Sequence, residues 1–130
     1  MQKQLMTKYT GSCHCGAVRF EIDAEIDHVR SCDCSVCHQR GALNFRVPKN
    51  KLYLKSSWDV LTVYEWGSRT AKDYFCKSCG ILSFRRPSDP TQKEIAEGVK
   101  PFDGWAVNVR CIESICLDSL PIKKIYGSRI

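Results

Sequence analysis

Nine cysteines in 130 residues constrain this chain more than any other feature of its sequence. Seven of them fall in three short motifs, which are Cys13-His14-Cys15, Cys32-Asp33-Cys34-Ser35-Val36-Cys37 and Cys76-Lys77-Ser78-Cys79. In a secreted protein such clusters would predict disulfides, whereas in a reducing compartment they predict metal ligands. The odd number weakly favours metal ligands, because a full set of disulfides would leave one thiol unpaired.

The N-terminal residues carry no signal for secretion. Residues 1–8 contain no apolar stretch long enough for a signal peptide. No window of the sequence approaches the roughly 18 apolar residues of a membrane span. We therefore expect a soluble, cytoplasmic protein whose thiols stay reduced, and one domain over residues 1–130 suits this length.

The basic excess of the chain is small and dispersed. The net charge is +6, and no run of lysine and arginine is longer than two residues. Zinc-bound thiolates would lower this charge further. Since the basic stripe typical of nucleic-acid interfaces is missing, we do not expect a nucleic-acid partner, and a surface that attracts small anions is the simpler interpretation.

Alternation of apolar and polar residues predicts a mainly β fold. Residues 18–22 and 43–47 show the two-residue period of half-buried strands. Further strands are expected at residues 52–54, 60–66, 74–75, 81–84 and 105–109, which are rich in β-branched and aromatic residues. Helical signals are confined to short turns at residues 35–40, 94–97 and 117–120, and residues 87–104 are expected to form an irregular surface loop.

The first and third motifs predict one four-sulfur zinc site. The two-residue spacer between Cys76 and Cys79 lets one tight turn direct both sulfurs at one ion, and Gly80 can supply the positive φ of that turn. Cys13 and Cys15 can chelate from a loop. Joining the two pairs would tie the N-terminal strand to a distant hairpin, which stabilises a small β domain. The alternative is four unrelated core cysteines.

The middle motif predicts a second zinc site made of Cys32, Cys34 and Cys37. Three thiolates leave one coordination position open, and an open position distinguishes catalytic from structural zinc. A thiol bound there would be held as a thiolate, which is a nucleophile at neutral pH. The alternatives are a site closed by His38 or by a distant residue, and a site without metal.

The two remaining cysteines, Cys111 and Cys116, match neither chelating spacing. We expect both to be small buried hydrophobic side chains. His14 and His38 lie beside motif cysteines, and we expect them to face solvent or to bond the backbone rather than to bind metal.

The three motifs, in this order, resemble the glutathione-dependent formaldehyde-activating enzyme family, also called the centromere protein V/GFA domain. The resemblance extends over nearly the whole chain. Its segments are residues 11–20 (GSCHCGAVRF), residues 32–37 (CDCSVC) followed by Gly41-Ala42, residues 75–80 (FCKSCG), and residues 107–112 (VNVRCI) followed by Leu117-Asp118.

The resemblance implies an Mss4-like fold of several coiled antiparallel sheets with zinc-bearing loops. It implies two Zn²⁺ ions per chain, a structural one held by Cys13, Cys15, Cys76 and Cys79, and a second, labile or catalytic one held by Cys32, Cys34 and Cys37. The family's named reaction joins formaldehyde to glutathione as S-(hydroxymethyl)glutathione. The resemblance therefore implies a zinc-dependent carbon–sulfur lyase that adds a small, glutathione-like thiol to an aldehyde, with the second cysteine set at the catalytic site.

The chain departs from the family pattern at Asp33, where histidine is more common. The aspartate would add negative charge beside an anionic three-thiolate site and oppose an anionic thiol. Five basic residues could offset that charge, and they are Arg40, Arg46, Arg85, Arg86 and Arg110.

Two other classes of function fit the same residues. One is a non-catalytic zinc-binding module for a protein or nucleic-acid partner. The other is a redox- or metal-responsive thiol protein, because closely spaced thiols oxidise once metal leaves them.

Overall fold

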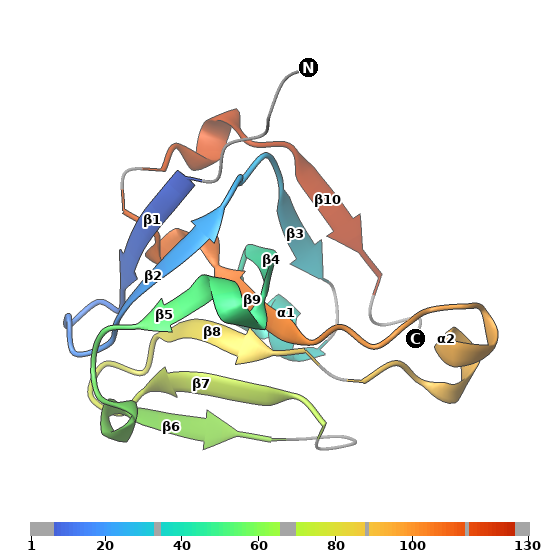
Figure 1. Ribbon diagram of the computed structural model, residues 1–130, viewed down its shortest axis with the longest axis horizontal. Coiled ribbons are helices and arrows are strands. Elements are labelled where there is room, and N and C mark those ends of the chain that lie inside the picture. Colours follow the sequence, from blue (N-terminus) through green and yellow to red (C-terminus); the bar gives the residue numbers. More distant parts are fainter. Residues whose placement is uncertain (1–6, 33–34, 66–69, 88, 114, 127–130) are drawn as a thin grey trace.

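The strands of this protein form two β-sheets. The computed structural model describes residues 7–32, 35–65, 70–87, 89–113 and 115–126, with the backbone alone for residues 35–37. Within these residues the smaller sheet has the order β1-β2-β5 and the larger one the order β10-β3-β4-β9-β8-β7-β6 (Figure 1). The described pairings are antiparallel, apart from β10, which runs parallel to β3 at one edge.

The strands are β1 (Thr7–Ser12), β2 (Arg19–Ala24), β3 (Val29–Cys32), β4 (Asn44–Pro48), β5 (Leu52–Leu54), β6 (Leu61–Tyr64), β7 (Lys72–Cys76), β8 (Leu82–Arg86), β9 (Gly104–Asn108) and β10 (Ile122–Ile125). The helices are α1 (Ser35–Arg40) and α2 (Gln92–Ala96), with 3₁₀ turns at Lys49–Lys51, Trp58–Val60, Val109–Cys111 and Leu117–Ser119. The prediction of a mainly β fold is confirmed.

Among the described residues, no helix has the length and apolar character needed to cross a membrane.

The hydrophobic core lies between the two sheets. In β2, Phe20 and Ile22 are buried while Arg19 and Glu21 face outwards, which is the alternation predicted from the sequence. The ring of Phe20 meets that of Phe84 from β8 edge to face, with centroids 5.6 Å apart. This contact joins the sheets at the centre of the core.

The opposite face of the large sheet is polar, although it is also buried. Asp73 in β7 lies directly across from Arg85 in β8, and Arg85 lies across from Ala106 in β9. Asp73 and Ser83 are fully buried, and Asn44 and Asn108 nearly so. Buried polar groups are costly unless they are paired, so a second buried polar face suggests a role beyond packing.

Three strands were not predicted from the sequence. They are β1, β3 and β10, and all are short or polar strands. Helix α2 overlaps the helical turn predicted at residues 94–97, begins two residues earlier, and carries a capping box between Thr91 and Glu94. It lies at the periphery, away from the sheets (Figure 1).

Two local predictions were wrong. Val109 belongs to a 3₁₀ turn rather than to the end of β9, because the side chain of Asn108 caps that turn. Cys116 is exposed rather than buried. The end of the strand predicted at residues 60–66 includes Trp66, which lies outside the described residues.

Candidate metal centre

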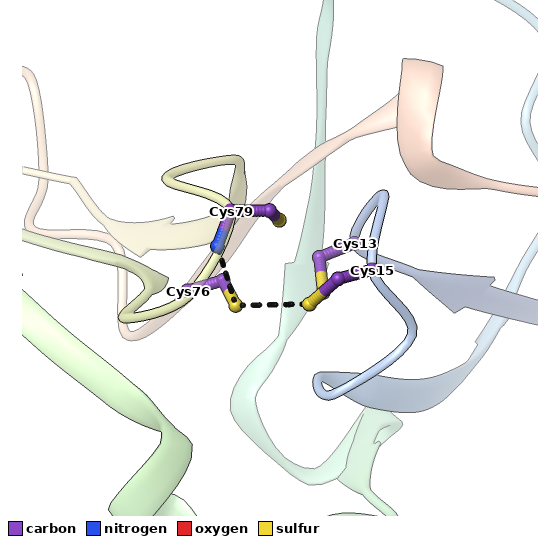
Figure 2. Close-up of side chains that lie close together, drawn as sticks. All are labelled: Cys13, Cys15, Cys76 and Cys79. Atoms are coloured by element: carbon purple, nitrogen blue, oxygen red, sulfur yellow. Dashed lines mark hydrogen bonds between the residues drawn. The ribbon is translucent and has the colours of Figure 1, made fainter.

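Four cysteine sulfurs converge between two loops. Cys13 and Cys15 come from the connection between β1 and β2, and Cys76 and Cys79 come from the turn between β7 and β8 (Figure 2). All four Sγ atoms lie within 4.8 Å of one another. The Sγ atom of Cys15 is 3.6 Å from that of Cys13 and 3.6 Å from that of Cys76.

Each loop is shaped by backbone hydrogen bonds that the sequence makes available. The N–H of Cys13 donates to the carbonyl of Val18, and the N–H of Cys76 donates to the carbonyl of Ile81. In the second loop the N–H of Gly80 donates to the carbonyl of Cys76 at 2.9 Å. Gly80 has a φ of 77°, which only glycine adopts without strain, as expected from its place after Cys79.

Backbone N–H groups also point at the sulfurs. The N–H of Val18 lies 3.3 Å from the Sγ atom of Cys13, and the N–H groups of Ser78 and Cys79 lie 3.3 and 3.4 Å from that of Cys76. The N–H of Cys79 lowers the pKa of Cys76, and this outweighs the effect of burial, which raises it. These donors favour the thiolate form that a metal ion requires.

The pKa values of Cys79 and Cys15 are shifted in opposite directions. Burial raises the pKa of Cys79, but the backbone N–H groups of Ile81 and Cys15 lower it more, to about 6. The N–H of Ala17 lowers the pKa of Cys15, whereas the neighbouring sulfurs of Cys76 and Cys13 raise it more, to about 11. A divalent cation would remove this repulsion and allow four thiolates.

The geometry fits one tetrahedral ion. At Zn–S distances of about 2.3 Å, a tetrahedron places sulfur atoms about 3.8 Å apart. The two sulfur–sulfur distances of 3.6 Å agree with this value. Four thiolates in a closed set are typical of structural zinc, since no position remains for a substrate. The cluster is therefore able to hold one metal ion, and its donors suit zinc.

Cys111 lies near this cluster without belonging to it. Its Sγ atom donates to the carbonyl of Leu82 at 3.7 Å and lies 3.8 Å from the Nδ2 atom of Asn108. Burial raises the pKa of the Cys111 thiol. It is half-buried, less than the sequence led us to expect, and it packs against the core.

The second predicted site is described only in part. Cys32 is half-buried at the end of β3, while Asp33 and Cys34 lie outside the described residues and the side chain of Cys37 is not described. Among the described residues, the structure brings three or more candidate metal ligands together at the four-cysteine cluster. His14 and His38 are exposed, as expected.

A pocket adjoins Cys32. Its volume is about 430 Å³, and it lies between the end of β3, the end of β10 and the residues that connect α1 to β4. Its lining is Ser31, Cys32, His38, Gly41, Ala42, Leu43, Arg110, Lys124, Ile125 and Tyr126. Two of these, Arg110 and Lys124, are exposed and carry positive charge, so the pocket favours an anion. Nothing in the sequence signalled Lys124, because β10 was not predicted.

The five arginines proposed to offset Asp33 have different surroundings. Arg110 lines the pocket, and its Nε atom donates to the carbonyl of Gly41. Arg46 interacts electrostatically with Cys32, although burial is the main influence on this arginine and lowers its pKa.

The other three arginines bind carboxylates. Arg40 and Arg85 both bind Asp73, whereas Arg86 binds Asp103 and lies over the ring of Trp105.

Comparison with known proteins identifies the family. Residues 8–101 match the family model described as "Glutathione-dependent formaldehyde-activating enzyme". The chain belongs to this family, which we abbreviate as GFA. The chain is also similar to a protein from Rhodobacter sphaeroides of known crystal structure, with 32% sequence identity and a TM-score of 0.68. The alignment covers 90% of this chain and 100% of that one.

GFA membership agrees with the metal centre. The matched residues include both halves of the four-cysteine cluster as well as the segment that contains Cys32. The family and the closed donor set together support a zinc-binding protein.

Proposed function

We propose that this GFA protein is a zinc-dependent carbon–sulfur lyase that adds a glutathione-like thiol to a small aldehyde such as formaldehyde. The observation that carries the proposal is the basic pocket beside Cys32. A volume of about 430 Å³ falls in the range of small-molecule sites. The four-cysteine cluster would hold the structural zinc, and Cys32, Cys34 and Cys37 would hold a second zinc at the pocket.

The pocket suits an anionic thiol. Glutathione carries two carboxylates and one ammonium group, and is therefore a net anion. Arg110 lies just after β9, lines the pocket and donates to the carbonyl of Gly41. Lys124 lies on β10 and lines the same pocket. Their charges would bind a carboxylate and thereby orient the sulfur towards the end of β3, where Cys32 lies. These two residues would also offset the charge of Asp33.

The proposed reaction is an addition that needs no oxidant. A zinc ion with an open position would stabilise the thiolate form of a thiol bound there. The thiolate sulfur would attack the carbonyl carbon, forming a C–S bond as the C=O π bond breaks. The carbonyl oxygen would then take one proton from water or from a polar group of the pocket. The reverse reaction releases the aldehyde and the thiol.

The proposal predicts that Cys34→Ala removes the second zinc and the catalysed reaction together. Zinc per chain should fall from about two to about one, because three thiolates are reduced to two while the first cluster is untouched. Exchange between formaldehyde and glutathione, followed by NMR, should fall to the uncatalysed rate. Cys116→Ala, which removes an exposed cysteine outside both sites, is the matched control.

Two outcomes would contradict the proposal. A wild-type protein with both sites loaded that does not accelerate the exchange would exclude glutathione–formaldehyde chemistry. One zinc in both wild type and Cys34→Ala, even after zinc or glutathione is added, would shift the interpretation towards a redox or binding role for the middle motif.

A second prediction concerns the charge of the pocket. Lys124→Met should raise KM for glutathione about two- to fivefold with little change in kcat, because an exposed ion pair contributes up to about 1 kcal/mol to binding. Lys123→Met is the matched control, since the neighbouring lysine on β10 does not line the pocket. An equal rise in KM for the uncharged thiol 2-mercaptoethanol would show that Lys124 does not act through charge.

A further inference from the structure

Three arginines rise from one area of the polar face of the large sheet. Arg46 of β4 and Arg85 of β8 are both in register with Ala106 of β9, the strand between them. Neighbouring strands lie about 4.8 Å apart, so these two arginine positions are about 10 Å apart across the sheet. Arg30 of β3 is in register with Asn44, which precedes Arg46 by two residues and therefore faces the same way. We call Arg30, Arg46 and Arg85 the arginine cluster.

The positive charge of this cluster is only partly balanced. Arg85 pairs with Asp73, but the other carboxylate oxygen of Asp73 contacts Arg40. Among the described residues, neither Arg30 nor Arg46 forms an ion pair. Burial is the main cause that lowers the pKa of Arg46, and the positive charges of Arg30 and Arg85 lower it further. The cluster therefore attracts a negatively charged group.

Two negative groups act on Arg46 without binding it. Glu94 of α2 and the sulfur of Cys32 both raise the pKa of Arg46, each by less than the causes that lower it. The Oε1 atom of Glu94 accepts the N–H of Thr91 at 2.9 Å, so this carboxylate is engaged within its own helix cap. The guanidinium group of Arg46 lies over the ring of Phe102, 5.1 Å from the ring centre. These contacts leave the guanidinium N–H groups of Arg46 available to a ligand.

The hydrogen-bonding groups of this area are also unused. Within the part of the chain that the structure describes, no hydrogen bond involves the side chain of Arg30 or Arg46. Asn44 lies beside both arginines and is 7% exposed, and its Oδ1 atom is buried without a partner among these residues. A buried polar group without a hydrogen bond is rare in proteins, and a bound ion or water molecule commonly accounts for it.

We propose that the arginine cluster binds the oxyanion group, a carboxylate or a phosphate, of a small molecule. Arg30 and Arg46 would donate their unused N–H groups to its oxygens, and Arg85 would add positive charge. A guanidinium group can donate two parallel hydrogen bonds to a carboxylate or a phosphate, which suits arginine to this task. The site is distinct from the pocket beside Cys32, because none of the three arginines lines that pocket. It depends neither on a second zinc nor on the proposed reaction.

The test is an NMR titration of isotope-labelled, zinc-loaded protein at low salt, read at the Nε–H signals of the arginines. The two probes are inorganic phosphate and S-methylglutathione, which keeps the carboxylates of glutathione but has no free thiol. At least one probe should shift the signals of Arg30 and Arg46 in a saturable manner. The probe with the lower Kd identifies the ligand as a phosphate or as the carboxylates of a glutathione-like molecule.

Four variants show whether the cluster itself binds the probe. Arg46→Met should raise the Kd about tenfold, because it removes hydrogen bonds to a charged group, and Arg30→Met should act in the same direction. Arg46→Lys should lose less affinity, since it keeps the charge without the two parallel donors. Arg19→Met is the matched control, because it removes an exposed arginine from β2 in the other sheet, and its Kd should stay at the wild-type value.

Three results would overturn the inference. They are the absence of a saturable shift at Arg30 and Arg46 with either probe, a wild-type Kd in Arg46→Met, and equal weakening by Arg46→Met and Arg19→Met, which would reflect net charge alone. The exchange between formaldehyde and glutathione tests the proposed function separately. A protein that binds the anion at Arg46 without accelerating this exchange would refute the proposed function and support the inference.

Discussion

Replacing Cys76 by serine is expected to leave the chain without a stable fold. Cys76 is 1% exposed, and its sulfur lies 3.6 Å from that of Cys15 and accepts the N–H groups of Ser78 and Cys79. Binding of structural zinc contributes about 10–16 kcal/mol in zinc-finger peptides at neutral pH. This is as large as the whole free energy of unfolding of a typical domain, about 5–15 kcal/mol.

The variant should contain about one metal ion fewer than wild type and should lack a cooperative thermal transition. Metal content and near-UV circular dichroism measure the two effects on the same sample. Cys116→Ser is the control, since Cys116 is exposed and lies outside the cluster. A Cys76→Ser protein with wild-type metal content and melting temperature would show that the four sulfurs do not form a structural site.

Phe84→Ala is expected to have the largest effect among substitutions in the apolar core. Phe84 is 0% exposed, and its ring lies between 5.2 and 6.1 Å, centroid to centroid, from four other aromatic rings. Those rings belong to Phe20, Trp58, Tyr74 and Trp105. Deleting the ring removes contacts on both sides of the interface between the sheets.

The expected loss is about 3–5 kcal/mol in the free energy of unfolding, the range for buried phenylalanine. Urea denaturation of the zinc-loaded protein measures it. Tyr64→Ala on β6 is the control, because Tyr64 is 48% exposed, and its effect should stay within about 0.5 kcal/mol. A loss below 1 kcal/mol for Phe84→Ala would show that the neighbouring rings close the cavity.

The fold was predictable where alternation reflects burial on one face. The pattern of β2 follows its buried and exposed residues, and β4 was found in the same way. β1 and β10 have mostly exposed side chains, so they show no such alternation. β1 pairs with β2, the next strand in the chain, whereas β10 pairs with β3, more than 90 residues earlier. Pairing of this kind leaves no local signal.

The candidate site was predictable to a similar extent. Local spacing indicated which cysteines form pairs, and the structure brings the two pairs of the first cluster together. Pairs of distant polar residues gave no such signal. Asp73 and Arg40 are 33 residues apart, and the pocket depends on Lys124 and Tyr126 at the far end of the chain. The roles assigned to Cys32, Cys34 and Cys37 remain predictions.

The separation of the two halves of the cysteine cluster has a consequence for biosynthesis. Cys15 and Cys76 are 61 residues apart, so a ribosome adding about 5–20 residues per second makes the second pair about 3–12 s after the first. During that interval β1 and β2 exist with two unligated thiols and without the β8 surface that covers Phe20. We therefore expect zinc to enter the cluster late, when the core closes. In a zinc-starved cell, the core of newly made chains would stay open and their apolar strands would stay uncovered. Such chains would be substrates for chaperones and proteases.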